Sequence, residues 1–296
     1  MEEEGLYFEP RICVIGLGYV GLPLARLFST KYKTVGFELS QSRVDELMSG
    51  HDSTLEVEDE LLQSALANGF SCTTDIEAIR DCNFYVVAVP TPVDKNNNPD
   101  LRPLYGASET VGKVISKGDI VVYESTVYPG VTEDECIPVV EKVSGLRYNE
   151  EFFAGYSPER INPGDKEHTV EKIRKVTSGS TPEIGKIVDE VYASVITAGT
   201  HLAPTIKVAE AAKVIENSQR DINIAFVNHL ALLCERMGLN VWEVIAAAAT
   251  KPFGFMKFLP GPGLGGHCIP IDPFYLSWKA REYDFSTEFI ELAGKI

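Results

Sequence analysis

Residues 11–28 read RICVIGLGYVGLPLARLF, and they predict a strand, a tight turn and a helix in direct succession. The apolar run Arg11–Ile15 is typical of a buried strand, and the amphipathic run Leu22–Phe28 has helical spacing. The turn between them, GLGYVG, has the pattern G-x-G-x-x-G. Glycines in this pattern allow a tight turn and let a pyrophosphate approach the N-terminus of the helix. The stretch therefore predicts a dinucleotide-binding unit, and a purely structural glycine turn is the alternative.

An acidic residue after the next apolar run narrows the choice of dinucleotide. The run Thr34–Phe37 ends at Glu38, twenty residues beyond Gly18. A carboxylate at this place accepts hydrogen bonds from a ribose diol and repels a 2′-phosphate, so we expect NAD rather than NADP. Arg43 is a candidate for a hydrogen bond to the adenosine half, with an ordinary solvated arginine as the alternative.

Strand-like and helix-like runs then alternate as far as residue 197. The expected strands are residues 34–37, 84–89, 119–123, 152–155 and 194–197. The expected helices between them are residues 56–68, 104–116, 131–143 and 182–192. This alternation predicts an α/β fold, a doubly wound parallel sheet of the Rossmann type covered by helices on both faces.

Polar residues follow several of these strands. Ligands of open α/β sheets bind outside the carboxyl ends of the strands, so these residues are candidates for one cleft. We expect the cofactor to be bound by Gly16, Gly18, Tyr19, Val20, Gly21, Glu38, Arg43, Pro90, Thr91, Ser125 and Thr126. The hydroxyl of Thr126 and the carboxylate of Glu159 could also face this cleft, although each alone is more typical of a cap or a turn.

The pattern changes at Pro204, after which residues 205–237 contain no proline and no glycine. We expect one long helix here, then helices at residues 241–249 and 287–295. The chain is therefore divided into a dinucleotide-binding domain, residues 1–203, and a helical dimerisation and catalytic domain, residues 204–296. The last helix runs to the end of the sequence, so we expect the chain to be cut rather than finished.

Two features of the helical part suggest candidate catalytic residues. Lys213 and Asn217 share one face of the long helix in apolar surroundings, with a surface lysine as the alternative. Residues 259–275 read LPGPGLGGHCIPIDPFY, which excludes a helix or a central strand and predicts a tight loop. Cys268 in this loop is a candidate reactive thiol, with a small buried cysteine as the alternative. Asp272, four residues further on, is near enough to share a pocket with Cys268. His267, next to Cys268, either tunes the reactivity of the thiolate or is an ordinary loop histidine.

Composition excludes several classes of protein. The 296 residues carry a net charge of −16, which argues against nucleic-acid binding, since that needs a basic face. No apolar run is long enough for a membrane span, and the N-terminus does not resemble a signal peptide. The six cysteines are scattered without a CxxC pair or zinc spacing. We therefore expect no metal site, and reduced thiols in the cytoplasm.

The chain resembles the UDP-glucose/GDP-mannose dehydrogenase family along essentially its whole length. The resemblance lies in the segments VAVPTP (87–92), ESTVYPG (124–130), YSPERINPG (156–164), AEAAKVIENSQRDINIAFVN (209–228), ATKPFGFMKF (249–258) and GPGLGGHCIPIDPFYL (261–276). Within the family, the last two segments are most similar to the branch that acts on UDP-N-acetylhexosamines. The family implies an NAD-binding Rossmann domain, a central helical domain and a C-terminal nucleotide-sugar domain, which this chain lacks.

The resemblance implies a four-electron oxidation of the C6 alcohol of UDP-N-acetyl-D-glucosamine to a uronic acid, for surface polysaccharides. Cys268 would be the nucleophile, and Lys213 and Asn217 would stabilise an oxyanion. Asp272, Thr126 and Glu159 would position or deprotonate the hydroxyl and the hydrolytic water. The implied substrate-binding residues are Glu159, Arg160, Lys213, Asn217, Arg220, Phe255, Gly265 and His267. The helix at residues 205–237 would form a homodimer.

Three features depart from the family pattern, and three other functions stay open. Pro163 replaces a second acidic residue, His229 replaces a glutamate, and the C-terminal domain is missing. The first rival function keeps the chemistry but uses UDP-N-acetylmannosamine, UDP-N-acetylgalactosamine or UDP-glucose. The second is a two-electron β-hydroxyacid dehydrogenase, which would not need Cys268. The third is a non-catalytic NAD-binding dimerisation module.

Overall fold

The computed structural model describes the chain apart from residues 1–7, 95–97, 162–168, 263–271 and 296. The described residues form two compact units. The first contains residues up to Thr91 and Leu101–Glu210, and the second contains Pro92–Asp100 and the chain from Ala211 onward. The division near residue 203 stays a prediction.

The first unit is built on a six-stranded parallel sheet in the order β3-β2-β1-β4-β5-β6. Its strands are β1 (Arg11–Ile15), β2 (Lys33–Phe37), β3 (Ser71–Thr73), β4 (Phe84–Val87), β5 (Ile120–Tyr123) and β6 (Phe153–Tyr156). β1 is central and pairs with both β2 and β4. In this register Ile12 is paired with Thr34 of β2 and with Phe84 of β4. The chain order reverses at β1, which is where ligands bind in such sheets. The doubly wound Rossmann-type sheet is therefore confirmed.

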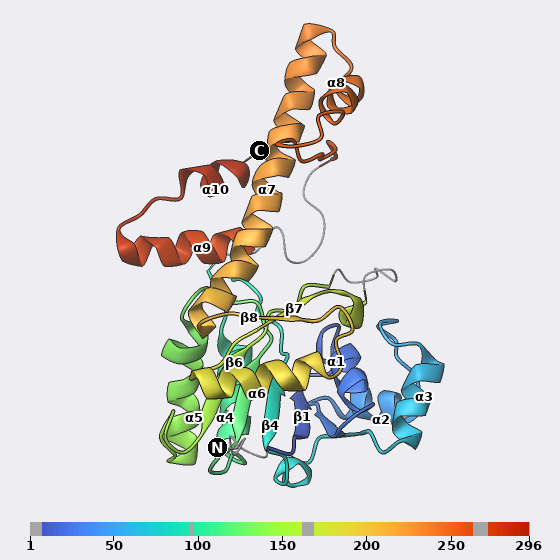
Figure 1. Cartoon of the computed structure of the whole chain (residues 1–296), viewed down its shortest axis with the longest axis vertical. Helices are drawn as coiled ribbons and strands as arrows, with labels where there is room; N and C mark the ends of the chain where they lie inside the picture. The colour runs from blue at the N-terminus through green and yellow to red at the C-terminus, as the bar shows by residue number, and fades with distance from the viewer. Residues whose placement is uncertain (1–7, 95–97, 162–168, 263–271, 296) are drawn as a thin grey trace, which may run out of the picture. The chain divides into compact units, whose positions relative to one another are not determined.

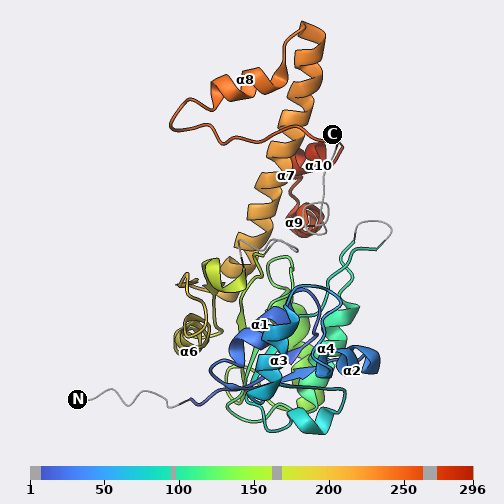
Figure 2. The same cartoon turned by 90° about the vertical axis from the view of Figure 1, so that its right-hand side faces the viewer.

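Helices cover both faces of this sheet. They are α1 (Gly21–Phe28), α2 (Gln41–Met48), α3 (Asp59–Ala67), α4 (Arg102–Gly112), α5 (Ile137–Ser144) and α6 (Pro182–Ala193). Short turns of other helix types lie at η1 (Ile76–Ile79), η2 (Val131–Cys136, a π-helical turn) and η3 (Val170–Lys172). α1 and α6 pack on the apolar side chains of one face in a common core, and Figure 2 shows α6 and α4 on opposite sides of the sheet.

The expected strand at residues 194–197 is wrong. Val195 and Ile196 are buried, but both of their amides donate to the carbonyl of Tyr192 and so close the end of α6. The apolar signal therefore came from core packing and not from strand pairing. The next strand is β8 (Thr200–Leu202), which pairs in parallel with β7 (Lys175–Thr177) in a separate two-stranded sheet.

The second unit is helical. Its elements are α7 (Ile206–Met237), which begins in the first unit, α8 (Val241–Ala248), α9 (Asp272–Ala280), η4 (Arg281–Tyr283) and α10 (Glu288–Ala293). α7 is the long orange helix of Figure 1, and it has 32 residues. It ends at Met237, and Gly238 directly after it has a left-handed φ of 68°, which suits a helix end. None of the helices in the described ranges is long and apolar enough to cross a membrane.

The expectation of a loop through Tyr275 is wrong at its C-terminal end. Asp272–Tyr275 form the first turn of α9, so Asp272 is the first residue of a helix. Pro273 is tolerated there because the first amides of a helix have no partner within it. The side chain of Tyr275 is buried, and its hydroxyl donates to the carbonyl of Pro92 at 3.2 Å.

Candidate active site

The glycine turn is tightly packed on one side and open on the other. Gly16 has a φ of 91°, and a Cβ there would lie 2.9 Å from the carbonyl oxygen of Ala88. A Cβ on Gly21 would lie only 1.8 Å from the carbonyl oxygen of Gly16. A Cβ on Gly18, in contrast, would meet nothing within 4 Å. The turn thus keeps a free space at Gly18, and it fits a pyrophosphate at the start of α1.

The start of α1 offers donors to an anion. In the described part of the chain no side chain caps this helix, whose N-cap position is Val20. The first amides of a helix lack partners within it and carry a partial positive charge. Tyr19 is exposed and Val20 half-buried beside them. This helix start therefore suits a phosphate group, and the contact of Tyr19 and Val20 with NAD stays a prediction.

Glu38 lies directly after β2 and is oriented by three amides. Its Oε2 accepts from the amide of Leu17 at 3.0 Å, and its Oε1 accepts from the amides of Leu39 at 2.8 Å and Ser40 at 3.2 Å. The carboxylate is therefore held against the glycine turn. This is the place from which it can accept hydrogen bonds from a ribose diol.

Arg43 contacts the same turn and is not an ordinary solvated side chain, so that alternative is wrong. Its Nε and Nη2 donate to the carbonyl of Leu17 at 3.2 and 3.1 Å. Nη1 lies 2.9 Å from Glu46 and Nη2 lies 2.8 Å from Asp52. The guanidinium thus braces the turn, and its contact with the adenosine half stays a prediction.

The loops after β4 and β5 are joined to each other. The hydroxyl of Thr91 donates to the carbonyl of Thr126 at 2.7 Å. The hydroxyl of Ser125 donates to the carbonyl of Val89 at 2.5 Å, while Pro90 is exposed. Since parallel strands end at one edge of the sheet, these residues lie at the same edge as the glycine turn. The structure therefore brings the predicted cofactor-binding residues to one edge.

A buried charged cluster lies beyond β5 and β6. The ammonium of Lys175, the first residue of β7, lies 2.7 Å from Glu124 Oε2 and 2.8 Å from Glu159 Oε2. The hydroxyl of Tyr192 on α6 donates to the other oxygen of Glu124. All four side chains are buried.

The cluster separates the pKa values of its two carboxyl groups. Burial raises the pKa of Glu124 to about 7 against the attraction of Lys175. Burial also opposes ionisation of Glu159, but Lys175 and the amides of Arg160 and Ile161 hold the pKa of Glu159 below its usual range. Glu159 is therefore ionised at neutral pH, and Glu124 is the group that takes up a proton.

Glu159 is also tied to the loop that follows β6. Its Oε1 accepts from the amides of Arg160 at 2.6 Å and Ile161 at 2.8 Å. The guanidinium of Arg160 donates to the carbonyl of Arg174 at 2.8 Å. Sequence reasoning missed Glu124 and Lys175. For Glu124 the available signal was a charged residue directly after the apolar strand β5, whereas the three residues of β7 gave no signal for Lys175.

In the second unit, Lys213 and Asn217 are 6% and 5% exposed, so the alternative of a surface lysine is wrong. Asp221, four residues further along α7, is 2% exposed, and burial raises the pKa of its carboxyl group. The spacing of four could have revealed this third buried polar residue. In the same unit Arg220 and His229 are exposed, and Phe255 is half-buried.

The remaining predicted residues belong to the segment around residues 263–272. Gly265, His267 and Cys268 lie outside the described residues. Asp272 begins α9, but its side chain also lies outside them. Within the described ranges, no group of three His, Cys, Asp or Glu side chains could hold a metal ion.

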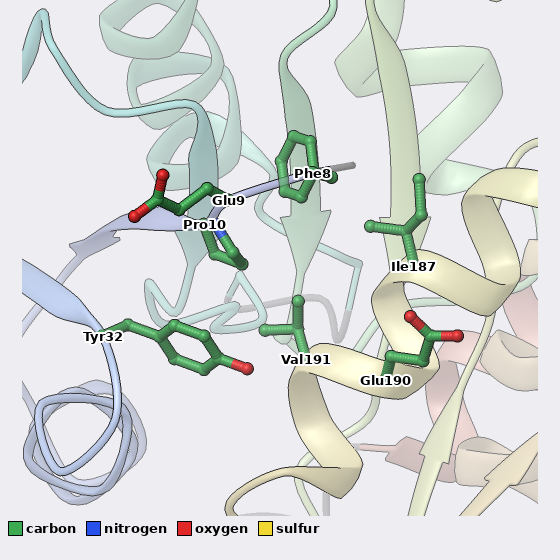
Figure 3. A pocket seen from close by; sticks show the side chains of 7 residues that line it. All are labelled: Phe8, Glu9, Pro10, Tyr32, Ile187, Glu190 and Val191. Carbon is green, nitrogen blue, oxygen red and sulfur yellow. The ribbon is translucent and has the colours of Figure 1, made fainter. Parts of the chain in front are cut away.

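A pocket of about 290 Å³ lies at the opposite edge of the sheet (Figure 3). It is lined by Phe8, Glu9, Pro10, Tyr32, Ile187, Glu190 and Val191. Phe8–Pro10 precede β1, and Tyr32 precedes β2, so the pocket opens at the amino ends of these strands. Ligands of open α/β sheets bind at the carboxyl ends, and this pocket is therefore separate from the predicted site.

Comparison with known proteins shows the family of the chain. Residues 10–196 match the model of the UDP-glucose/GDP-mannose dehydrogenase family, NAD binding domain, and residues 207–296 match the central domain of that family. The chain is 58% identical over 285 residues to the UDP-N-acetyl-D-glucosamine 6-dehydrogenase of Pseudomonas aeruginosa and 52% identical over 287 residues to that of Salmonella typhi. These alignments cover 96% and 97% of this chain, and it spans 66% of the length of each relative.

A solved structure shows the same fold. The UDP-D-ManNAc dehydrogenase of Pyrococcus horikoshii superimposes with a TM-score of 0.88 at 32% sequence identity. The superposition covers 96% of this chain and 67% of that one. The sheet and the helical unit thus have a counterpart in a nucleotide-sugar dehydrogenase.

Proposed function

The chain belongs to the UDP-glucose/GDP-mannose dehydrogenase family, and from this membership we propose that it carries out an NAD-dependent oxidation of UDP-N-acetyl-D-glucosamine. The C6 alcohol would become a carboxylate in a four-electron reaction. The observation that carries the proposal is the 58% identity, over 96% of the chain, to the UDP-N-acetyl-D-glucosamine 6-dehydrogenase of Pseudomonas aeruginosa. The buried Lys213 and Asn217 and the glycine turn with Glu38 support it.

The proposed chemistry proceeds through a thioester on Cys268. NAD, when bound, supplies the acceptor for one hydride in each of two oxidations. The alcohol first loses a hydride and a proton and becomes an aldehyde. The thiolate of Cys268 adds to the aldehyde carbon, and the resulting thiohemiacetal loses a second hydride to give a thioester. Water then cleaves the thioester, which yields the carboxylate and regenerates the thiol.

The other site residues would serve this sequence. We propose that Lys213 and Asn217 donate to the oxygen that becomes negative when the thiolate adds to the aldehyde. Thr126 and Asp272 would orient the hydroxyl and the hydrolytic water. Both oxygens of Glu159 are occupied by protein donors, which favours a positioning role for this carboxylate over a role as a base.

We also propose that the protein is a cytoplasmic homodimer that supplies polysaccharide synthesis. Apolar side chains are exposed along α7, among them Val208, Ile215 and Phe226, and exposed apolar surface of this kind is typical of a subunit interface. The five described cysteines are free thiols, which suits a reducing compartment.

The test is the number of NADH formed per UDP-N-acetyl-D-glucosamine consumed. It uses this chain and a fusion to the C-terminal third of the Pseudomonas aeruginosa relative, each with a Cys268→Ser variant. Two NADH per sugar, lost in Cys268→Ser, is the expected result. One NADH per substrate with an active serine variant would favour a two-electron hydroxyacid dehydrogenase. NAD binding without turnover in either protein, also with the other three UDP-sugars, would favour a non-catalytic module.

A further inference from the structure

The peptide groups on either side of Leu17 are held by two oppositely charged side chains. The carboxylate of Glu38 accepts from the amide of Leu17 at 3.0 Å. The guanidinium of Arg43 donates to the carbonyl of the same residue at 3.1 and 3.2 Å. Leu17 itself is buried in the core between Gly16 and Gly18. The conformation of the cofactor-binding turn therefore depends on where these two charges are kept.

The place of Arg43 is set by Asp52, a carboxylate with no exposed surface. Asp52 Oδ1 lies 2.8 Å from Arg43 Nη2 and also accepts from the amide and the hydroxyl of Thr54. Its Oδ2 accepts from the amides of Glu56 and Val57, each at 3.0 Å. Burial opposes ionisation, but these hydrogen bonds hold the pKa of Asp52 below its usual range. A rigid, ionised carboxylate thus holds the guanidinium on the turn.

We propose that Asp52 is a positioning residue that makes the turn selective for NAD over NADP by keeping Arg43 on the Leu17 carbonyl. Glu46, whose Oε1 lies 2.9 Å from Nη1 of Arg43, adds a second negative charge beside the guanidinium. A free guanidinium beside Glu38 would attract a 2′-phosphate, because arginine binds phosphate through two parallel hydrogen bonds. With Arg43 held and neutralised, only the carboxylate of Glu38 faces the ribose.

The proposal is tested by the dissociation constants of NAD and NADP, measured by calorimetry on this chain. In Asp52→Asn the dissociation constant of NAD is expected to rise about three- to tenfold while that of NADP stays or falls, so that the ratio of the NADP constant to the NAD constant falls at least threefold. Asp45→Asn is the matched control, because Asp45 lies on α2 together with Arg43 but its carboxylate accepts from Gln41. This control is expected to leave both constants unchanged.

The double variant Asp52→Asn, Arg43→Gln separates selectivity from general damage to the fold. Its NADP-to-NAD ratio is expected to return to the original value, because no guanidinium is left to move. Arg43→Gln alone is expected to weaken both nucleotides equally, since they share the turn, and this variant also serves if Asp52→Asn does not fold. An unchanged ratio in Asp52→Asn, a lowered ratio that persists without Arg43, or full NAD affinity in Arg43→Gln would overturn the proposal. Failure of the unaltered chain to bind NAD would overturn the cofactor assignment as well.

Discussion

The ammonium of Lys175 donates to the carboxylate of Glu159 at 2.8 Å, and both side chains are buried. Lys175 opens β7, whereas Glu159 follows β6, so the pair joins the small two-stranded sheet to the loop beyond the main one. The two carboxylates of Glu159 and Glu124 raise the pKa of Lys175 although burial opposes this, and the lysine stays charged. The loop that carries Arg160 is therefore fixed by charge as well as by packing.

Removing the lysine charge should destabilise the first unit strongly. Lys175→Met leaves two carboxylates buried without a cation, and breaking a buried pair in this way costs about 3–5 kcal/mol. The free energy of unfolding from urea denaturation measures the loss. Lys207→Met is the control, because Lys207 and Asp134 are about half exposed and 3.4 Å apart. Its expected cost is below about 1 kcal/mol. Equal stability of the two variants would contradict a structural role for the cluster.

The regular part of the fold was predictable because its signals are local. The expected strands at β1, β2, β4, β5 and β6 and the long helix match the structure to within two residues at each end. The helices expected at residues 56–68, 104–116 and 131–143 differ from α3, α4 and α5 by three to six residues at one end. α2 was missed because only Val44 and Leu47 of its residues are buried, too few for a visible apolar period. β7 was missed because a three-residue strand leaves no periodic signal.

The site was predictable where one motif determines the geometry and not where distant segments meet. The glycine turn and Glu38 lie as their spacing indicated, since a strand, a turn and a helix are contiguous. Asp52 meets Arg43 across a loop, and Lys175 meets Glu124 across 51 residues. Such pairings depend on the packed fold, and no pattern within either segment encodes them.

Stability of the first unit should fall as the pH rises from about 5 to about 7. Glu210 is buried at the start of α7 and accepts from the amides of Gly130 at 2.6 Å and Thr132 at 3.0 Å, yet burial raises its pKa from 4.5 to about 7. Over this range the folded protein keeps a proton that the unfolded chain releases, so each increase in pH lowers the free energy of unfolding. The free energy of unfolding is expected to fall by on the order of 3 kcal/mol because of Glu210. The titration of Glu124, whose pKa is also raised by burial, lowers this free energy further.

Urea denaturation at a series of pH values checks this prediction. Glu210→Gln removes the titrating group, and the slope between pH 5 and 7 should become shallower. Glu109→Gln, an exposed glutamate on α4, should leave the slope as it is. A slope that is identical in all three proteins would show that Glu210 does not take up the proton.

Alkylation should single out Cys268 among the six cysteines. The five described cysteines are buried, and burial raises the pKa of Cys72 and Cys136 to about 12, which leaves little reactive thiolate. A brief reaction of the native chain with iodoacetamide, followed by peptide mass spectrometry, should therefore find Cys268 modified first. Cys82 is the competitor, since a hydrogen bond from Cys13 lowers its pKa. Faster modification of Cys82 would contradict the nucleophile assignment.

Alanine at Gly18 and at Gly21 should separate cofactor binding from folding. A Cβ at Gly18 meets no protein atom within 4 Å, so Gly18→Ala should keep its melting temperature. The methyl group would instead occupy the space kept for the pyrophosphate, and the dissociation constant of NAD should rise tenfold or more.

A Cβ at Gly21 would lie 1.8 Å from the carbonyl oxygen of Gly16, so Gly21→Ala must shift the backbone of the turn. Such overpacking should cost about 1–3 kcal/mol or more and lower the melting temperature. Thermal unfolding and NAD titration of both variants decide the matter, and unchanged NAD affinity in a well-folded Gly18→Ala would mean that the pyrophosphate does not lie on this turn.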